Sequence, residues 1–199
     1  MAQELKGKWL LMTHISTMSI PAVPITEFTD NLLIMHDFTE KIGEVSYRAE
    51  GSRILGTNVD MEFNFVNNHQ IEFFIKGKRN NTPEIIKELR LKLLPTKGDV
   101  DPAFIEEQTY EIDIFGKLQL LEFKKDLSKS PVQLDRLNFC SKFKLEKFDQ
   151  TWFVVLYYDN DLRKYVFPIK EMNENWLLIY YDNGTGLGWH KMYSVVSKH

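Results

Sequence analysis

The residue types that most often carry chemistry are few and widely spaced in this chain. Five histidines occur, and no two of them have the spacing of a local metal-ligand pair: His14, His36, His69, His190 and His199. His36 and Asp37 could form an acid–base dyad, but neighbouring residues in a strand point to opposite faces. The histidines therefore predict neither catalysis nor a metal site.

The common catalytic and phosphate-binding motifs are absent from the sequence. Neither Gly-x-Ser-x-Gly nor His-Glu-x-x-His occurs, and no glycine run is followed by Lys-Ser or Lys-Thr. The segment GTGLG at 184–188 is similar in letters to a dinucleotide loop, but no helix follows that could hold a phosphate at its N-terminus. We therefore expect a protein that is not an enzyme and that uses no cofactor and no metal.

The aromatic residues give a clearer indication of function. Trp9, Trp152, Trp176 and Trp189 all fall in predicted strands, where they either line an apolar cavity or fill a core. Aromatic side chains supply a large contact area at modest entropic cost. Our candidate ligand-binding residues are therefore Trp9, Trp152, Trp176 and Tyr180.

Composition and charge limit the class of partner. The 199 residues include 28 acids and 25 bases, and this balance does not favour nonspecific nucleic-acid binding. The single cysteine, Cys140, excludes an internal disulfide. No apolar run approaches the roughly 20 residues that span a bilayer. As written, the chain is expected in the cytoplasm, or in the periplasm or outside the cell if a signal peptide has been removed.

These residues must be positioned mainly by strands, because alternation of apolar and polar residues dominates the sequence. The clearest case is a predicted β-hairpin over 59–76, whose turn contains Asn67 and Asn68. Further strands are predicted over 8–14 and 31–38, a hairpin around 39–43, and a four-stranded meander in the last 50 residues. The fold class is therefore mostly β, an antiparallel barrel or strongly bent sheet of about eight to ten strands.

Three segments depart from this rhythm. Pro21 and Pro24 predict a loop or an edge strand within 15–30. Residues 82–94 predict one short helix, with Thr82 as its cap and Pro83 at its first position, although LRLKLL alone could form a strand. The turn-rich segment after this helix is the best boundary candidate. We expect a single β domain over 1–199, with a two-lobed split near 95–102 as the alternative.

The stretch LKGKWLLMTH, residues 5–14, resembles the Gly-x-Trp opening of the lipocalin and calycin superfamily. It is also similar to bacterial lipocalin-like domains, in which a segment like TEFTDNLLI, here 26–34, comes next. The resemblance implies that Trp9 closes the base of a β-barrel. Two features depart from the pattern: lipocalins usually pack a late Arg on this Trp, where the final strand here has His190 and Lys191, and the predicted helix lies in mid-chain.

Together these observations predict a noncatalytic, lipocalin-like protein that binds a small apolar ligand. The alternative is a protein-interaction module, such as a bacterial immunity or adaptor protein that neutralises a partner through an exposed aromatic and acidic face. The oligomeric state is left open by the sequence.

Overall fold

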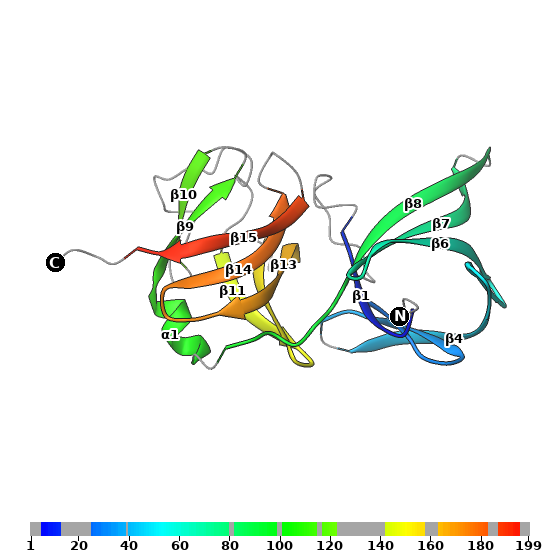
Figure 1. Cartoon of the computed structure of the whole chain (residues 1–199), viewed down its shortest axis with the longest axis horizontal. Helices are drawn as coiled ribbons and strands as arrows, with labels where there is room; N and C mark the ends of the chain where they lie inside the picture. Colours follow the sequence, from blue (N-terminus) through cyan, green and yellow to red (C-terminus); the bar gives the residue numbers. More distant parts are fainter. Residues whose placement is uncertain are drawn as a thin grey trace. The chain divides into compact units, whose positions relative to one another are not determined.

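The computed structural model describes residues 5–12, 25–38, 40–79, 82–98, 101–114, 117–122, 142–157, 163–182 and 187–195. These residues form two antiparallel β-sheet units and one short helix, which confirms the predicted fold class (Figure 1). Described residues up to Leu93 belong to the first compact unit, and those from Leu94 onward belong to the second. The single β domain over 1–199 and its alternative, a two-lobed split near 95–102, both stay predictions.

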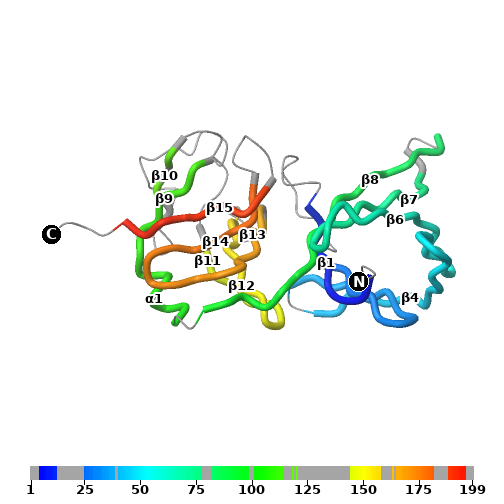
Figure 2. The backbone as a smooth tube through the Cα atoms, viewed as in Figure 1, coloured from blue at the N-terminus to red at the C-terminus, as the bar shows by residue number. Residues whose placement is uncertain are grey.

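The first unit is a closed barrel in which every strand pairs with the next and β8 pairs with β1. Figure 2 shows the backbone passing around it from β1 in blue to β8 in green. Its eight strands are β1 (Gly7–Leu11), β2 (Ile25–Phe28), β3 (Leu32–His36), β4 (Lys41–Glu50), β5 (Arg53–Gly56), β6 (Val59–Asn67), β7 (Gln70–Arg79) and β8 (Thr82–Lys92).

The alternation in the sequence sets the register of these strands. In the β6–β7 hairpin, Phe63 lies opposite Phe73 and Phe65 lies opposite Ile71, as the two-residue rhythm predicted. Inside the barrel, the rings of Phe28 and Phe73 stack with centroids 5.5 Å apart. They form a buried cluster with Trp9, whose side chain is 0% exposed. Apolar side chains therefore fill part of the barrel interior.

The predicted helix over 82–94 is wrong, because this segment is strand β8. It pairs with β7 from Arg79 opposite Thr82 to Gln70 opposite Leu91, and with β1 from Trp9 to Leu11. The expected apolar helix face is not buried, since Ile85 is 66% exposed. Two rows of interstrand hydrogen bonds have overridden a weak local helix propensity.

The prediction of a loop or edge strand over 15–30 is wrong for residues 25–28. Strand β2 pairs with β1 on one side and with β3 on the other, so it is an inner strand of the barrel. Pro21 and Pro24 lie outside the described residues. The hairpin predicted around 39–43 is confirmed by the pairing of β3 with β4.

The second unit is a seven-stranded antiparallel sheet in the order β10-β9-β15-β14-β13-β12-β11. The predicted C-terminal meander is confirmed, because β12 to β15 pair in sequence. The elements of this unit are α1 (Pro102–Glu107), β9 (Thr109–Ile114), β10 (Lys117–Glu122), β11 (Lys142–Phe148), β12 (Thr151–Tyr157), β13 (Arg163–Met172), β14 (Trp176–Asp182) and β15 (Leu187–Ser194).

The short helix α1 begins at the end of the segment that the sequence predicted as a turn-rich connection. Asp101 caps this helix, and its Oδ1 accepts a hydrogen bond of 2.9 Å from the Ala103 backbone N–H. Pro102 comes directly after the cap, where its fixed backbone angle suits a helix start. Among the described residues, no helix has the length and apolar character needed to cross a membrane.

Substitution of Phe73 by Ala should lower the free energy of unfolding by about 3–5 kcal/mol. The substitution removes a buried ring that stacks on Phe28 and leaves a void in the barrel core. The control Ile85→Ala alters an exposed side chain on the paired strand and should change stability by no more than about 0.5 kcal/mol. Urea denaturation followed by circular dichroism measures both values, and equal losses would contradict the assigned core.

Alkaline destabilisation should depend on Tyr181 in the second unit. Burial, with a further contribution from the Asp113 carboxylate, raises the pKa of Tyr181 from 10.0 to about 12. A raised tyrosine pKa means that the folded state favours the neutral phenol, so this stabilisation is complete below pH 10 and is lost as the pH rises through about 12. Its hydroxyl also donates a 2.7 Å hydrogen bond to the Asp113 carbonyl.

Measurement of the free energy of unfolding against pH tests this prediction. The variant Tyr181→Phe should be less stable than the natural protein at neutral pH and should lose less additional stability over the alkaline range. The control Tyr193→Phe removes a hydroxyl from a half-exposed ring and should leave the neutral-pH stability unchanged. An unchanged alkaline slope in Tyr181→Phe would count against the burial of the phenol as its cause.

Candidate ligand-binding cavity

The barrel contains a cavity of about 520 Å³ that is partly open to solvent. This volume lies in the range typical of small-molecule sites. Apolar side chains predominate among its lining residues, which come from β1, β2, β3, β4, β6, β8 and the β5–β6 turn: Leu11, Thr26, Phe28, Leu33, Met35, Val45, Asn58, Val59, Met61, Glu88 and Arg90. The barrel thus has a filled part, around the stacked Phe28 and Phe73, and an open part beside it.

Strand register explains why these side chains face inward. Directly paired residues share a face of a sheet, and alternate residues along a strand return to that face. Leu11 pairs with Arg90, and Thr26 pairs with Met35. Glu88 lies two residues before Arg90 on the same strand, so its side chain faces the inside of the barrel as well. Closure of the barrel therefore brings Arg90 of β8 to Thr26 of β2, which contact each other inside it.

One polar cluster interrupts the apolar wall. The Arg90 Nη2 atom lies 2.5 Å from Glu88 Oε2, and its Nε atom lies 3.1 Å from the same oxygen. Arg90 Nη1 donates to Thr26 Oγ1. The guanidinium also lies over the Phe73 ring, 5.4 Å from its centroid. These contacts hold Arg90 on three sides within the barrel.

Both charged side chains of this cluster are largely withdrawn from solvent. The side chain of Arg90 is 11% exposed and that of Glu88 is 14% exposed. A charge in such a place is costly unless an opposite charge and hydrogen bonds compensate it. Glu88 and Arg90 are the charged members of the cavity lining and compensate one another, so this part of the wall is polar but close to electrically neutral.

The sequence analysis missed Arg90 and Glu88. Their signal was the alternation in EIIKELRLK, which puts Glu88 and Arg90 on one face of a strand. The helical interpretation of 82–94 concealed this signal, because residues two apart on a helix do not share a face. Pairing of β8 within the closed barrel overrides the local helix propensity, and for this reason the sequence did not reveal Glu88 and Arg90.

The structure places Trp9 in the barrel but not among the residues that line the cavity. Its indole Nε1 donates a 2.7 Å hydrogen bond to the Leu5 carbonyl, and its ring packs in the cluster that contains Phe28. Lys92 Nζ lies 5.5 Å from the Trp9 ring centroid. A cation of β8, the last barrel strand, thus packs on this tryptophan. His190 and Lys191, the residues at the place of the late Arg in the lipocalin pattern, belong to β15 of the second unit.

The other three candidate residues, Trp152, Trp176 and Tyr180, belong to the second unit. Trp176 and Tyr180 lie four residues apart on the same face of β14, and Tyr180 contacts Trp189 with ring centroids 5.1 Å apart. Trp152 pairs with Ile169, which pairs with Ile179, so Trp152 lies on the opposite face. The structure therefore assigns Trp9 to one unit and these three residues to the other, and ligand contact by any of the four stays a prediction.

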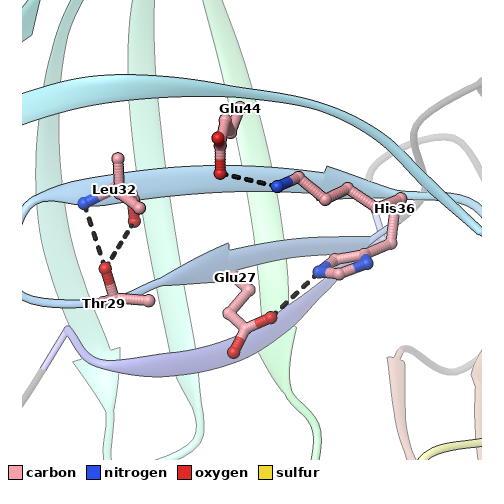
Figure 3. A network of polar contacts seen from close by, with 6 residues as sticks. Glu27, Thr29, Leu32, His36 and Glu44 are labelled. Atoms are coloured by element: carbon pink, nitrogen blue, oxygen red, sulfur yellow. Dashed lines mark hydrogen bonds and ion pairs between the residues drawn. The ribbon is translucent and has the colours of Figure 1, made fainter.

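His36 lies on the outside of the barrel, where it belongs to a structural hairpin. Its Nε2 atom is 2.9 Å from Glu27 Oε2 on the neighbouring strand (Figure 3). At the other end of the hairpin, the Leu32 N–H donates to Thr29 Oγ1. Asp37, the proposed dyad partner, accepts a hydrogen bond from the Glu40 backbone N–H in the next turn. These contacts fasten β2, β3 and β4 together.

Metal binding has no candidate centre in the described part of the chain, where no group of three or more histidine, cysteine or acidic side chains lies close enough to hold an ion. Two histidines of the sequence analysis, His14 and His199, and also Cys140, lie outside the described residues. The expectation of a protein without a metal stays a prediction.

The Glu88–Arg90 pair should behave as one energetic unit. Glu88→Leu or Arg90→Met alone leaves an uncompensated charge in the barrel, so each should destabilise it by about 1–3 kcal/mol. The double variant removes both charges and should cost less than the sum, with a coupling of about 1–3 kcal/mol. Chemical denaturation of the four proteins gives the coupling.

The exposed pair Lys41–Glu44 provides the matched control for this cycle. Its Nζ and Oε2 atoms lie 2.6 Å apart, but both side chains are about half exposed. The corresponding cycle with Lys41→Met and Glu44→Leu should yield a coupling of at most about 1 kcal/mol. Additive effects at Glu88 and Arg90 would show that the barrel pair is as well solvated as the surface pair.

Comparison with known proteins does not identify a family for this chain. No family model and no curated protein matches this chain. The closed antiparallel barrel of eight strands is compatible with a lipocalin-like or calycin-like fold, with Gly7 and Trp9 in its first strand. Function must therefore be argued from the cavity and its lining residues.

Proposed function

We propose that the barrel is a noncatalytic binding module that holds a small, mainly apolar molecule in its cavity. The observation that carries this proposal is an apolar space of about 520 Å³ inside a closed barrel. A space of this size and character would bury most of a small ligand, and each Å² of apolar surface removed from water contributes roughly 25 cal/mol.

The wall of the cavity supports this proposal because packing and hydrogen bonds within the barrel fix its side chains. Phe28 lines the cavity and also stacks on Phe73. Behind it, the Tyr47 ring packs edge-on against Phe28 and is fixed by a 2.6 Å hydrogen bond from its hydroxyl to the Thr29 carbonyl. A preformed wall lowers the entropic cost of binding. In this proposal Trp9 supports the wall through the core cluster that it shares with Phe28.

A protein-interaction role is the second candidate, and one observation in the second unit favours it. Leu120 lies opposite Glu111, which lies opposite Tyr193, and all three side chains are exposed on one face of the sheet. Leu118, on the same face of β10, is 72% exposed. An exposed apolar row beside an acidic residue is the kind of surface that protein partners cover.

Native mass spectrometry of the gently purified chain distinguishes the two roles. A retained mass of small-molecule size supports the cavity, whereas a bound protein that is released by the double substitution L120E/Y193A supports the exposed row. Loss of a small-molecule adduct in that double variant would contradict the placement of the binding site in the barrel.

Val59→Trp should abolish binding of a neutral apolar dye such as N-phenyl-1-naphthylamine, or weaken it by at least about tenfold. Val59 lines the cavity, so an indole at this position would occupy the space that the dye needs. The dye's fluorescence increases in apolar surroundings, and titration of the protein gives its dissociation constant. The expected loss is steric and should occur in a folded protein.

Val66→Trp is the matched control for this experiment. Val66 belongs to the same strand, β6, but is 50% exposed and does not line the cavity. This variant should bind the dye like the natural protein, and circular dichroism should confirm the fold of both variants. Equal dye binding by folded Val59→Trp would place the binding site elsewhere.

A further inference from the structure

The polar cluster in the cavity wall has more hydrogen-bonding groups than its contacts within the barrel use. A guanidinium carries five N–H groups. In Arg90, Nε and one N–H of Nη2 are directed to Glu88 Oε2, and one N–H of Nη1 is directed to Thr26 Oγ1. One N–H on each terminal nitrogen is left over, and no described residue accepts it. The wall therefore keeps hydrogen-bond donors for a ligand.

The same cluster also keeps an acceptor. Both hydrogen bonds from Arg90 go to Oε2 of Glu88, and no described residue donates to Oε1. Since Glu88 lines the cavity, this oxygen adds an anionic acceptor beside the free N–H groups of Arg90. Donor and acceptor thus lie together at one place in a wall that is otherwise mainly apolar.

We propose that the cavity selects an amphiphile with an uncharged hydroxyl head group, and that the neutralised Arg90 discriminates against carboxylates and amines. This inference rests on the proposed binding function. A hydroxyl both accepts and donates hydrogen bonds, so it can satisfy Arg90 and Glu88 at once. The apolar body of the ligand then lies against side chains such as Met35 and Met61.

A charged head group would add a charge that the Glu88–Arg90 pair does not compensate. A carboxylate can accept from Arg90, but it brings a second negative charge beside Glu88 and cannot donate to it. An ammonium group can donate to Glu88, but it places a second positive charge beside Arg90. In either case an excess charge is held in a barrel where those side chains are at most 14% exposed, and such a charge is unfavourable.

Competition by a series of ten-carbon ligands tests the proposal. 1-Decanol, decanoic acid and decylamine share one apolar chain and differ in the head group, and each is titrated at neutral pH against the protein loaded with N-phenyl-1-naphthylamine. Decanol should bind at least about tenfold more tightly than either charged analogue. A tighter dissociation constant for decanoate or decylamine would overturn the selection of a neutral head.

Glu88→Gln provides the second measurement. The glutamine keeps the size of the side chain but removes the negative charge, so Arg90 is left with an uncompensated charge. Decanoate should then gain at least about tenfold in affinity relative to decanol, which reverses or removes the preference. The control Glu44→Gln neutralises a half-exposed carboxylate that does not line the cavity, and it should preserve the natural order.

These outcomes separate this inference from the proposed function. Dye binding that is blocked in Val59→Trp but shows no preference for decanol supports the cavity and contradicts the head-group selection. Failure of the dye to bind the natural protein contradicts the binding function itself. If Glu88→Gln does not fold, the order of affinities of the natural protein for decanol, decanoate and decylamine tests the inference by itself.

Discussion

Closure of the barrel by β8 is the constraint on which the rest of the first unit depends. This strand pairs with β7 over its length and with β1 near its end, and the second pairing removes the last free edge of the sheet. Closure also creates an inside, because alternate residues of every strand are then directed toward a common axis. Both the aromatic core and the cavity exist only because this strand completes the wall.

Side chains of different size divide the barrel interior into a filled part and an open part. Phe28, Phe73 and Trp9 fill one part, while Val45, Val59 and the two methionines leave space in the other. Phe28 belongs to both parts, since it stacks on Phe73 and lines the cavity. The same packed ring therefore stabilises the fold and forms a firm boundary for a ligand, which links the stability of the barrel to the shape of its cavity.

Sequence periodicity predicted much of this fold because the two-residue rhythm is set by local geometry. It identified the β6–β7 hairpin and the C-terminal meander. It failed at 82–92, where Thr82 and Pro83 gave a good local helix start but the neighbouring strands supplied more hydrogen bonds. The site depended on this same segment, so the error concealed Glu88 and Arg90. The four aromatic candidates were predicted from their type and their place in predicted strands, and the long-range register that assigns them to two units is not visible in local sequence.

The two units solve the problem of apolar surface in different ways. The barrel has no edge strands and directs the apolar side chains of its core and cavity inward, which suits the binding of a small molecule. The described sheet of the second unit ends at β10 and β11, and β10 presents Leu118 and Leu120 to solvent. An open sheet can bury such residues only against another surface, whereas a closed barrel needs none. The cavity of the barrel, with its compensated charge pair, is therefore the feature to which we assign the proposed ligand.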